Sequence, residues 1–393
     1  MNDVLEFLWH GLRDALLMAW EVWWALVLGF AISAIVQAWV PRARIERSLA
    51  DSGGRAVAVA TGLGAASSSC SYAAVAIAKS LFQKGASATT ALAFQFASTN
   101  LVWELGLVLW VLIGWQFTLA EYLGGIVMVA LMALLLRRFV SPVLERQARE
   151  HARAADAHGD DPHCHHHHHG GGHGHGHGGE DSADDELGLR ERLRSRAAWS
   201  QVAGNFRADW RMLYREIAVG FLLAGFIAQF GNGFFESLFI RSAPAPLPAL
   251  ENVLVGPLIA VASFVCSVGN VPLAAVLWSG GIGFAGVISF LFADLIVLPI
   301  VVIYRKYYGG AFALRIVALM ALTMILASLA ISGAFDVLGL IPTGPRPSRN
   351  DIFGTVGLDY KLVLNVLGAA IFAALLLLRA PAARASEAPV TVG

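Results

Sequence analysis

Long apolar runs constrain this chain more than any other feature of its sequence. Residues 15–40, 119–136, 311–333 and 361–378 each approach or exceed the roughly 20 residues that a helix needs to cross a bilayer. Only 14% of the residues are charged, against about 25% in soluble domains, and 57% are hydrophobic. The alternating pattern of membrane strands is missing. The sequence therefore predicts an all-α polytopic membrane protein.

An internal duplication sets the organisation of the chain. The segment 66–97 aligns without a gap on 262–293 at a shift of 196 positions, and 11 of the 32 positions are identical. A duplication of this kind predicts two similar structural halves. The matches include a Cys-Ser pair and a glycine: Cys70 with Cys266, Ser71 with Ser267 and Gly85 with Gly281.

Composition divides the chain into four parts. The stretch between the two copies is rich in Arg, Glu, Asp, Gly and His and has no apolar run, so it is interpreted as a soluble loop. The expected parts are a first membrane repeat at 1–140, a cytoplasmic His-rich loop at 141–200, a second membrane repeat at 201–335, and an external loop with a final transmembrane helix at 336–393.

The distribution of arginine predicts the topology. Arg-rich segments are expected in the cytoplasm, and the acidic N-terminus and residues 116–121 outside. A single span over 56–82 would deliver Arg137 and Arg138 to the wrong side. The conflict disappears if 56–82 and 252–279 are re-entrant helical hairpins. The prediction is then inverted-topology repeats with seven full spans and two hairpins, the N-terminus outside, and the His-rich loop and C-terminus in the cytoplasm.

The two hairpin turns form the candidate substrate site. Inverted symmetry would bring "SSSCS" and "SFVCSVGN" together, with thiols, hydroxyls and the N-termini of half-helices. Helix N-termini favour an anion, whereas thiolates suit a soft cation or a thiophilic metalloid. The alternative is that these residues are small side chains that permit close helix packing. The candidate substrate-binding residues are Ser69, Cys70, Ser71, Ser263, Cys266, Ser267 and Asn270.

Two acids inside apolar segments are candidates for proton coupling. Glu104 and Asp294 each stand in an apolar run, where a charge is costly and its usual role is a relay or a ligand that faces a cavity. An interhelical hydrogen bond is the structural alternative for Glu104.

A His-rich stretch holds ten of the twelve histidines, and it predicts binding of Zn, Cu or Ni. Its role is either collection of a transported ion or a solvated insert whose metal binding is incidental. No other cofactor is expected. The candidate metal ligands are His163, Cys164, His165, His166, His167, His168, His169, His173, His175 and His177.

The Cys-Ser turns and the segments that follow them carry a family resemblance. "AAVAIAKSLFQKGASATTALAFQFASTN" in one half and "GNVPLAAVLWSGGIGFAGVISFLFAD" in the other resemble the predicted-permease family that includes the ArsP-type organoarsenical efflux permeases. The resemblance implies a bacterial inner-membrane permease that exports something thiophilic. Tyr72 and Val268 stand where the family's fuller Cys-Ser-Cys form has a second cysteine, which argues against coordination of organoarsenicals by a cysteine cluster.

The functional expectation is a secondary transporter that exports a thiophilic metal or metalloid. A channel for an anion or a small sulfur compound, and a membrane receptor that senses metal, are the alternatives. No nucleotide-binding or nucleophile motif occurs, so an enzyme is not expected. The expected partners are the lipid bilayer and the substrate, with no nucleic acid, and a homo-oligomer is compatible with this interpretation.

Overall fold

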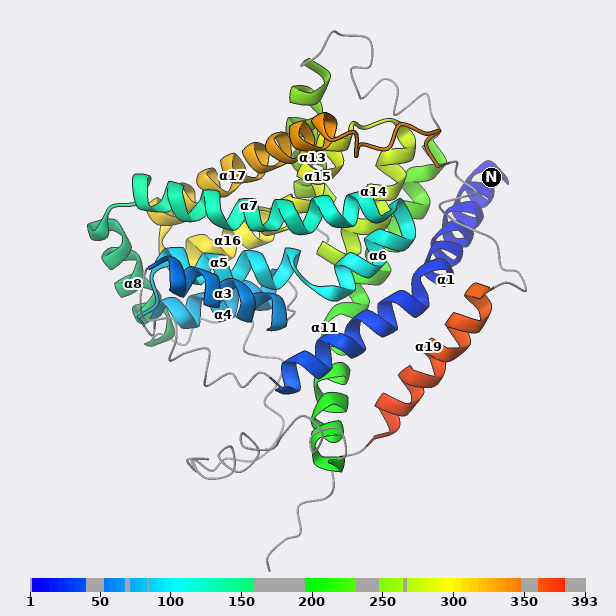
Figure 1. Ribbon diagram of the computed structural model, residues 1–393, viewed down its shortest axis with the longest axis horizontal. Helices are drawn as coiled ribbons and strands as arrows, with labels where there is room; N and C mark the ends of the chain where they lie inside the picture. The colour runs from blue at the N-terminus through cyan, green and yellow to red at the C-terminus, as the bar shows by residue number, and fades with distance from the viewer. Residues whose placement is uncertain are drawn as a thin grey trace, which may run out of the picture.

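The computed structural model describes residues 2–39, 53–67, 71–83, 85–157, 195–230, 247–263, 267–347 and 360–378, and every regular element within these ranges is helical (Figure 1). The all-α prediction is therefore confirmed for the described residues. The elements are α1 (Asn2–Trp39), α3 (Gly54–Ser67), α4 (Ser71–Gln83), α5 (Ala88–Asn100), α6 (Trp103–Ile113), α7 (Trp115–Phe139), α8 (Pro142–Ala157), α11 (Arg196–Ile227), η2 (Ala228–Phe230), α13 (Leu247–Ser263), α14 (Ser267–Gly280), α15 (Phe284–Phe292), η3 (Ala293–Leu295), α16 (Leu298–Tyr308), α17 (Gly310–Val337) and α19 (Tyr360–Leu377).

The described residues contain four to six candidate membrane spans. Four helices are long and apolar enough to cross a bilayer alone, namely α1, α7, α17 and α19. Two further pairs pass this test together, α5 with α6 and α15–η3 with α16, bent by 42° and 41°. The protein is therefore a multi-pass membrane protein, with fewer candidate spans than the seven expected. The expected span that fails the test of length and hydropathy is α11. It has 32 residues but is apolar only from Ile217 onward, because Arg207, Asp209 and Arg211 precede that part.

The helices of the two halves follow one another in the same order. Adding 196 to the bounds of α4, 71–83, gives 267–279, and α14 covers Ser267–Gly280. Adding 196 to the bounds of α7, 115–139, gives 311–335, and α17 covers Gly310–Val337. Contacts repeat as well, since α3 packs on α5 as α13 packs on α15. The matched glycines Gly85 and Gly281 follow α4 and α14 with φ of 112° and 116°, a conformation that favours glycine.

Each half contains a bend inside a membrane-length segment. Before the gap between α5 and α6, the side chains of residues 98–100 donate hydrogen bonds to backbone carbonyls one turn earlier. Such local bonds compete with continuation of the helix. In the second half, Pro299 lies in the first turn of α16 and has no backbone N–H for a preceding helix. Asp294 lies in η3, just before this bend.

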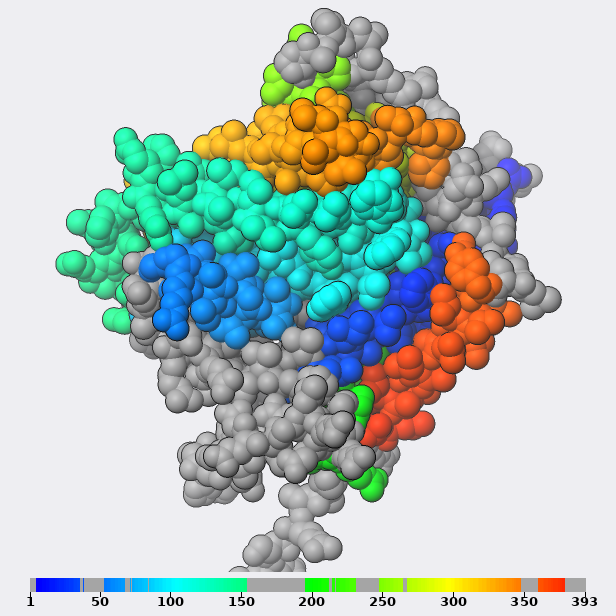
Figure 2. All heavy atoms as spheres, in the orientation of Figure 1, coloured from blue at the N-terminus to red at the C-terminus, as the bar shows by residue number. Residues whose placement is uncertain are grey.

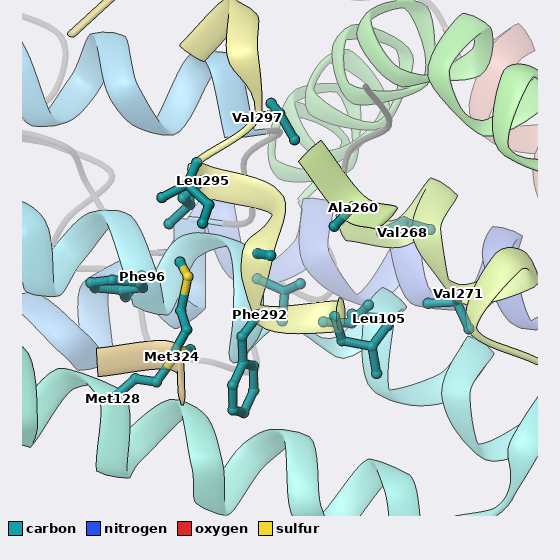
Figure 3. Close-up of a cluster of buried hydrophobic side chains, with 14 of the residues drawn as sticks. Phe96, Leu105, Met128, Ala260, Val268, Val271, Phe292, Leu295, Val297 and Met324 are labelled. Atoms are coloured by element: carbon teal, nitrogen blue, oxygen red, sulfur yellow. The ribbon is translucent and has the colours of Figure 1, made fainter. Parts of the chain in front are cut away.

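The core around the second bend is apolar and comes from both halves. Figure 3 shows Phe96 and Met128 of the first half near Phe292, Leu295 and Met324 of the second. All five side chains are fully buried. A polar group in such surroundings is costly unless it has a partner. The polar residues that do occur at this depth are therefore the candidates for function.

Two arginines hold corresponding turns of the two halves. The Nη2 of Arg149, on α8, donates to the carbonyl of Ala86 at 2.8 Å, and the Nη1 of Arg346 donates to the carbonyl of Ile282 at 2.8 Å. The guanidinium of Arg149 also lies 4.8 Å from the ring centroid of Phe82 in α4. That of Arg346 lies 4.2 Å from the ring centroid of Trp278 in α14. Ala86 and Ile282 are themselves related by the shift of 196 positions. The repeated contact therefore extends the likeness of the halves beyond their matched sequence.

Loss of either arginine is expected to destabilise the fold. Arg149→Met and Arg346→Met should each lower the free energy of unfolding by about 1–2 kcal/mol, because each removes a charge-assisted hydrogen bond and a cation–π contact. The measurement is the thermal unfolding of purified protein in detergent. Arg146→Met, at an exposed position of the same helix α8, is the matched control. An equal loss of stability in the control would contradict the assignment.

Helix α19 attaches to α1 through polar contacts, and Figure 2 shows it along α1 at the edge of the molecule. Asn365 donates from Nδ2 to the carbonyl of Trp20 at 2.9 Å, and its Oδ1 accepts from the backbone N–H of Trp24 at 3.1 Å. This carbonyl and this N–H are also hydrogen-bond partners in a regular α-helix, and α1 is helical throughout Asn2–Trp39. Lys361 adds an ion pair with Glu21. One amide side chain thus bridges one turn of α1.

Candidate functional site

Two serines from opposite halves of the chain meet at one carboxylate. The hydroxyl of Ser71 donates to Oδ2 of Asp294 at 2.7 Å, and the hydroxyl of Ser267 donates to the same oxygen at 2.5 Å. Ser267 and Asp294 are 5% and 0% exposed, and Ser71 is 1% exposed. The two serines, which are 196 residues apart in sequence, therefore each form a hydrogen bond to one common atom.

Helix ends surround this carboxylate. Ser71 is the first residue of α4 and Ser267 the first residue of α14, so two helices begin beside Asp294. The N-terminus of a helix carries a partial positive charge that stabilises a nearby anion. The backbone N–H groups of Asp294 and Leu295 also interact with the carboxylate. These dipoles give a site that tolerates a buried negative charge without a basic side chain.

The helices that precede the two turns end in the same way. The hydroxyl of Ser67, the last residue of α3, donates to the carbonyl of Gly64 at 2.9 Å, and that of Ser263, the last residue of α13, donates to the carbonyl of Ala260 at 2.9 Å. Ser263 also contacts Oδ1 of Asn270 at 3.3 Å. The buried Nδ2 of Asn270 has no hydrogen-bond partner among the described residues.

The structure brings five of the predicted residues into one region, at the starts of α4 and α14, the end of α13 and η3: Ser71, Ser263, Ser267, Asn270 and Asp294. Three other predicted substrate residues, Ser69, Cys70 and Cys266, lie outside the described residues. So do all the predicted metal ligands of the His-rich loop, His163, Cys164, His165, His166, His167, His168, His169, His173, His175 and His177.

Glu104 lies elsewhere in the core. It is in the first turn of α6, 2% exposed, and its backbone faces Gly29 of α1 so closely that a Cβ at Gly29 would be 2.5 Å from the Glu104 Cα. Its acidic neighbour is Asp209 of α11, with which it interacts electrostatically. Glu104 therefore faces the contact of α1 and α11, and no hydrogen bond joins it to Asp294.

A further buried acid, Glu121, was missed by the sequence analysis. The charge rule assigns residues 116–121 to an external loop, whereas α7 begins at Trp115 and holds Glu121 more than one turn inside the helix. The side chain is 0% exposed and is close enough to Asp294 to interact with it electrostatically. A carboxylate at the start of an apolar run, followed by Gly124 and Gly125 on the same helix face, was the available signal.

The described residues contain no group of three or more His, Cys, Asp or Glu side chains arranged to hold a metal ion. The site between the halves is instead made of two carboxylates, hydroxyls and amides. Such a set can bind a hydrogen-bonding solute, a proton or a hard cation through oxygen.

A multi-pass helical protein with duplicated halves, bent membrane segments and a buried polar centre has the architecture of a membrane transporter. The chain belongs to a family described as predicted permeases, whose model matches residues 13–333.

Two relatives have related sequences. Rv2963 of Mycobacterium tuberculosis, named as a permease, is 44% identical over 337 residues, which cover 86% of this chain and 79% of Rv2963. YraQ of Escherichia coli is 27% identical over 152 residues, 38% of this chain and 44% of YraQ. No solved structure matches the chain. The family places the chain among membrane transport proteins.

Proposed function

We propose that this protein is a secondary transporter of the bacterial inner membrane that exports a thiophilic metal or metalloid species. The observation that carries the proposal is the convergence of Ser71 and Ser267 on Asp294, because it joins the first residues of α4 and α14 at one buried point. The substrate would bind there between the cysteines that precede the two serines, Cys70 and Cys266. Ser69, Ser263 and Asn270 complete the proposed binding residues.

The proposed topology has inverted repeats, each with a re-entrant helical hairpin. A 14-residue helix such as α3 or α14 is only about 21 Å long, short of the roughly 30 Å hydrocarbon layer. Paired short helices that enter and leave by one membrane face would satisfy both this length and the arginine distribution. The N-terminus would then be outside, and the His-rich loop and the C-terminus in the cytoplasm.

The chemistry of the site favours a cationic cargo over an anionic one. Two helix N-termini alone would attract an anion, but Asp294 already lies there as a negative group with both serines as donors. A cysteine at a helix N-terminus has increased thiolate character, and thiolates bind soft metal ions. In the proposed cycle, the substrate binds at the turns and the two halves of the chain rearrange around it, which exposes the site to each face in turn.

Transport into proteoliposomes tests this function. The full chain is reconstituted, and uptake of Cu(I), Zn(II), Ni(II) and trivalent arsenite is followed beside chloride and thiosulfate. We expect the wild type to move at least one of the metal or metalloid species, and the double variant Cys70→Ala with Cys266→Ala to lose that flux. Deletion of residues 158–177 should leave the flux intact if the His-rich loop only collects ions, since the turns would still bind the cargo.

Each other outcome points to a different function. Unchanged metal flux in the double cysteine variant would remove the thiols from the site. Anion flux that does not depend on the thiols would support a channel, and absence of any flux, together with metal binding, would support a receptor.

A further inference from the structure

The centre of the molecule contains an excess of buried oxygen acceptors. Four side chains there have at least one buried oxygen with no hydrogen-bond partner among the described residues. Both carboxylate oxygens of Glu121 and the Oδ1 oxygen of Asp294 are buried and have no hydrogen-bond partner among the described residues. A buried acceptor without a donor has lost its hydrogen bonds to water without replacement, and the cost is larger when the acceptor is charged. The remaining two oxygens belong to the amides of Gln95 and Asn100.

These groups gather where α7 contacts both bends. A Cβ on Gly125 would lie 2.6 Å from the side chain of Leu101 and 3.7 Å from Asn100 Cβ, so α7 touches the first bend there. A Cβ on Gly124 would lie 2.4 Å from the ring of Phe292, just before η3. Glu121 stands one turn earlier on the same face of α7. The helix thus holds Glu121 between Asn100 and the segment that carries Asp294.

The two carboxylates have no basic partner. Neither Glu121 nor Asp294 forms an ion pair or a hydrogen bond with Lys, Arg or His among the described residues, and both are 0% exposed. The titratable groups that interact electrostatically with them are tyrosines, Tyr122 beside Glu121 and Tyr304 beside Asp294, and Tyr122 is also near Glu104. Two buried charges of the same sign repel each other, and a bound positive ion would relieve both this repulsion and the cost of burying them.

We propose that Glu121 and Asp294 form the binding site for one monovalent coupling cation, a proton or a sodium ion, of the transporter proposed above. The inference rests on that transport function and adds to it a residue, Glu121, and a stoichiometry. Asp294 links the cation to the cargo, because its Oδ2 accepts from the first residues of α4 and α14 while its Oδ1 has no hydrogen-bond partner in the part of the chain that the structure describes. Binding of a cation at Oδ1 weakens the hold of Oδ2 on the serines, and the turns that receive the cargo respond.

The duplication supports a single site. At the shift of 196 positions, Glu121 corresponds to Val317 and Asp294 corresponds to Ser98. Each half therefore supplies one acid where the other half has an uncharged residue. The two acids come from different halves and interact electrostatically, so they would make one cation site for each chain, whereas the serines occur in both halves.

Gradient-driven transport tests the coupling. Proteoliposomes with the full chain are given an inward or outward gradient of protons or of sodium, and the flux of the cargo that the wild type moves is measured. We expect one of the two gradients to accelerate the wild type, and Glu121→Gln to lower that acceleration at least about 10-fold. Size-exclusion chromatography and thermal unfolding in detergent check that Glu121→Gln is folded. Glu150→Gln, at an exposed position of α8, is the matched control.

A chemical measurement decides the inference without transport. Dicyclohexylcarbodiimide modifies protonated carboxyls in apolar surroundings, and peptide mass spectrometry of the purified wild type locates the product. We expect modification of Glu121 that decreases at higher pH for a proton site, or on addition of sodium at constant pH for a sodium site. Absence of modification at every pH, or equal gradient acceleration in Glu121→Gln, would overturn the inference. Wild-type cargo flux that ignores both gradients would also overturn it and leave the transport function standing, whereas absence of all flux would contradict the transport function alone.

Discussion

Replacing Asp294 with asparagine is expected to lower the rate of transport at least about 100-fold while the protein remains folded. The carboxylate accepts hydrogen bonds from both serines at one oxygen, and each bond to a charged acceptor contributes about 1.5–3 kcal/mol. The asparagine side chain is neutral, and its amide nitrogen donates where the carboxylate accepted. Ser71 and Ser267 would therefore lose the charged oxygen that accepts from both. The measurement is the initial rate of cargo uptake into proteoliposomes, with size-exclusion chromatography as the check on folding.

The matched control is Asp336→Asn, which removes a carboxylate from an exposed position of α17 in the same half of the chain. It should transport at the wild-type rate. If Asp294→Asn also transports at that rate, the meeting of the two serines at Asp294 is a structural contact and the site lies elsewhere.

The second large effect is expected at a helix contact. Gly64→Ala should lower the free energy of unfolding by about 1–3 kcal/mol, the usual cost of overpacking a core. A Cβ at this position would lie 2.5 Å from the backbone carbonyl oxygen of Phe94 and 2.9 Å from the Cβ of Ala97, and neither backbone can move without separating α3 from α5. Because α3 leads directly to the turn before Ser71, transport should fall together with stability.

Gly62→Ala, two residues earlier on α3, provides the comparison. Nothing lies within 4 Å of a Cβ at Gly62, and alanine is the better helix former by about 1 kcal/mol. This variant should be as stable as the wild type or more stable, by thermal unfolding in detergent. Equal melting temperatures for the two alanine variants would show that α3 and α5 are not in close contact.

The sequence predicted the parts of the site that carry a repeated or unusual signal. Ser71 and Ser267 stand in a polar turn that occurs twice, and Asp294 is a charge in an apolar run, so each was identifiable from its neighbours alone. Symmetry predicts the approach of the two serines but not their shared partner Asp294, because a contact between residues 223 positions apart depends on how the halves pack. Glu121 lies in the segment that the charge distribution assigns to a loop. Charge alone does not indicate that α7 starts six residues earlier.

The bends and α11 show where local patterns lose their predictive value. A count of apolar residues treats 86–115 as one segment, whereas the side chains of residues 98–100 bond to the preceding turn and end α5. The two predicted repeats imply that α11, which begins the second half of the chain, is a full span like α1. Its first 21 residues carry several charges instead, and its apolar part is short.

The bridge between Asn365 and α1 has a consequence for synthesis of the protein. Ribosomes make the N-terminal helix first, and 341 further positions separate Trp24 from the amide that accepts its N–H. Until that amide is made, the N–H of Trp24 and the carbonyl of Trp20 have each other as partners within α1. The polar contact between α1 and α19 therefore forms late in biogenesis, and a nascent chain that stops before residue 365 lacks it.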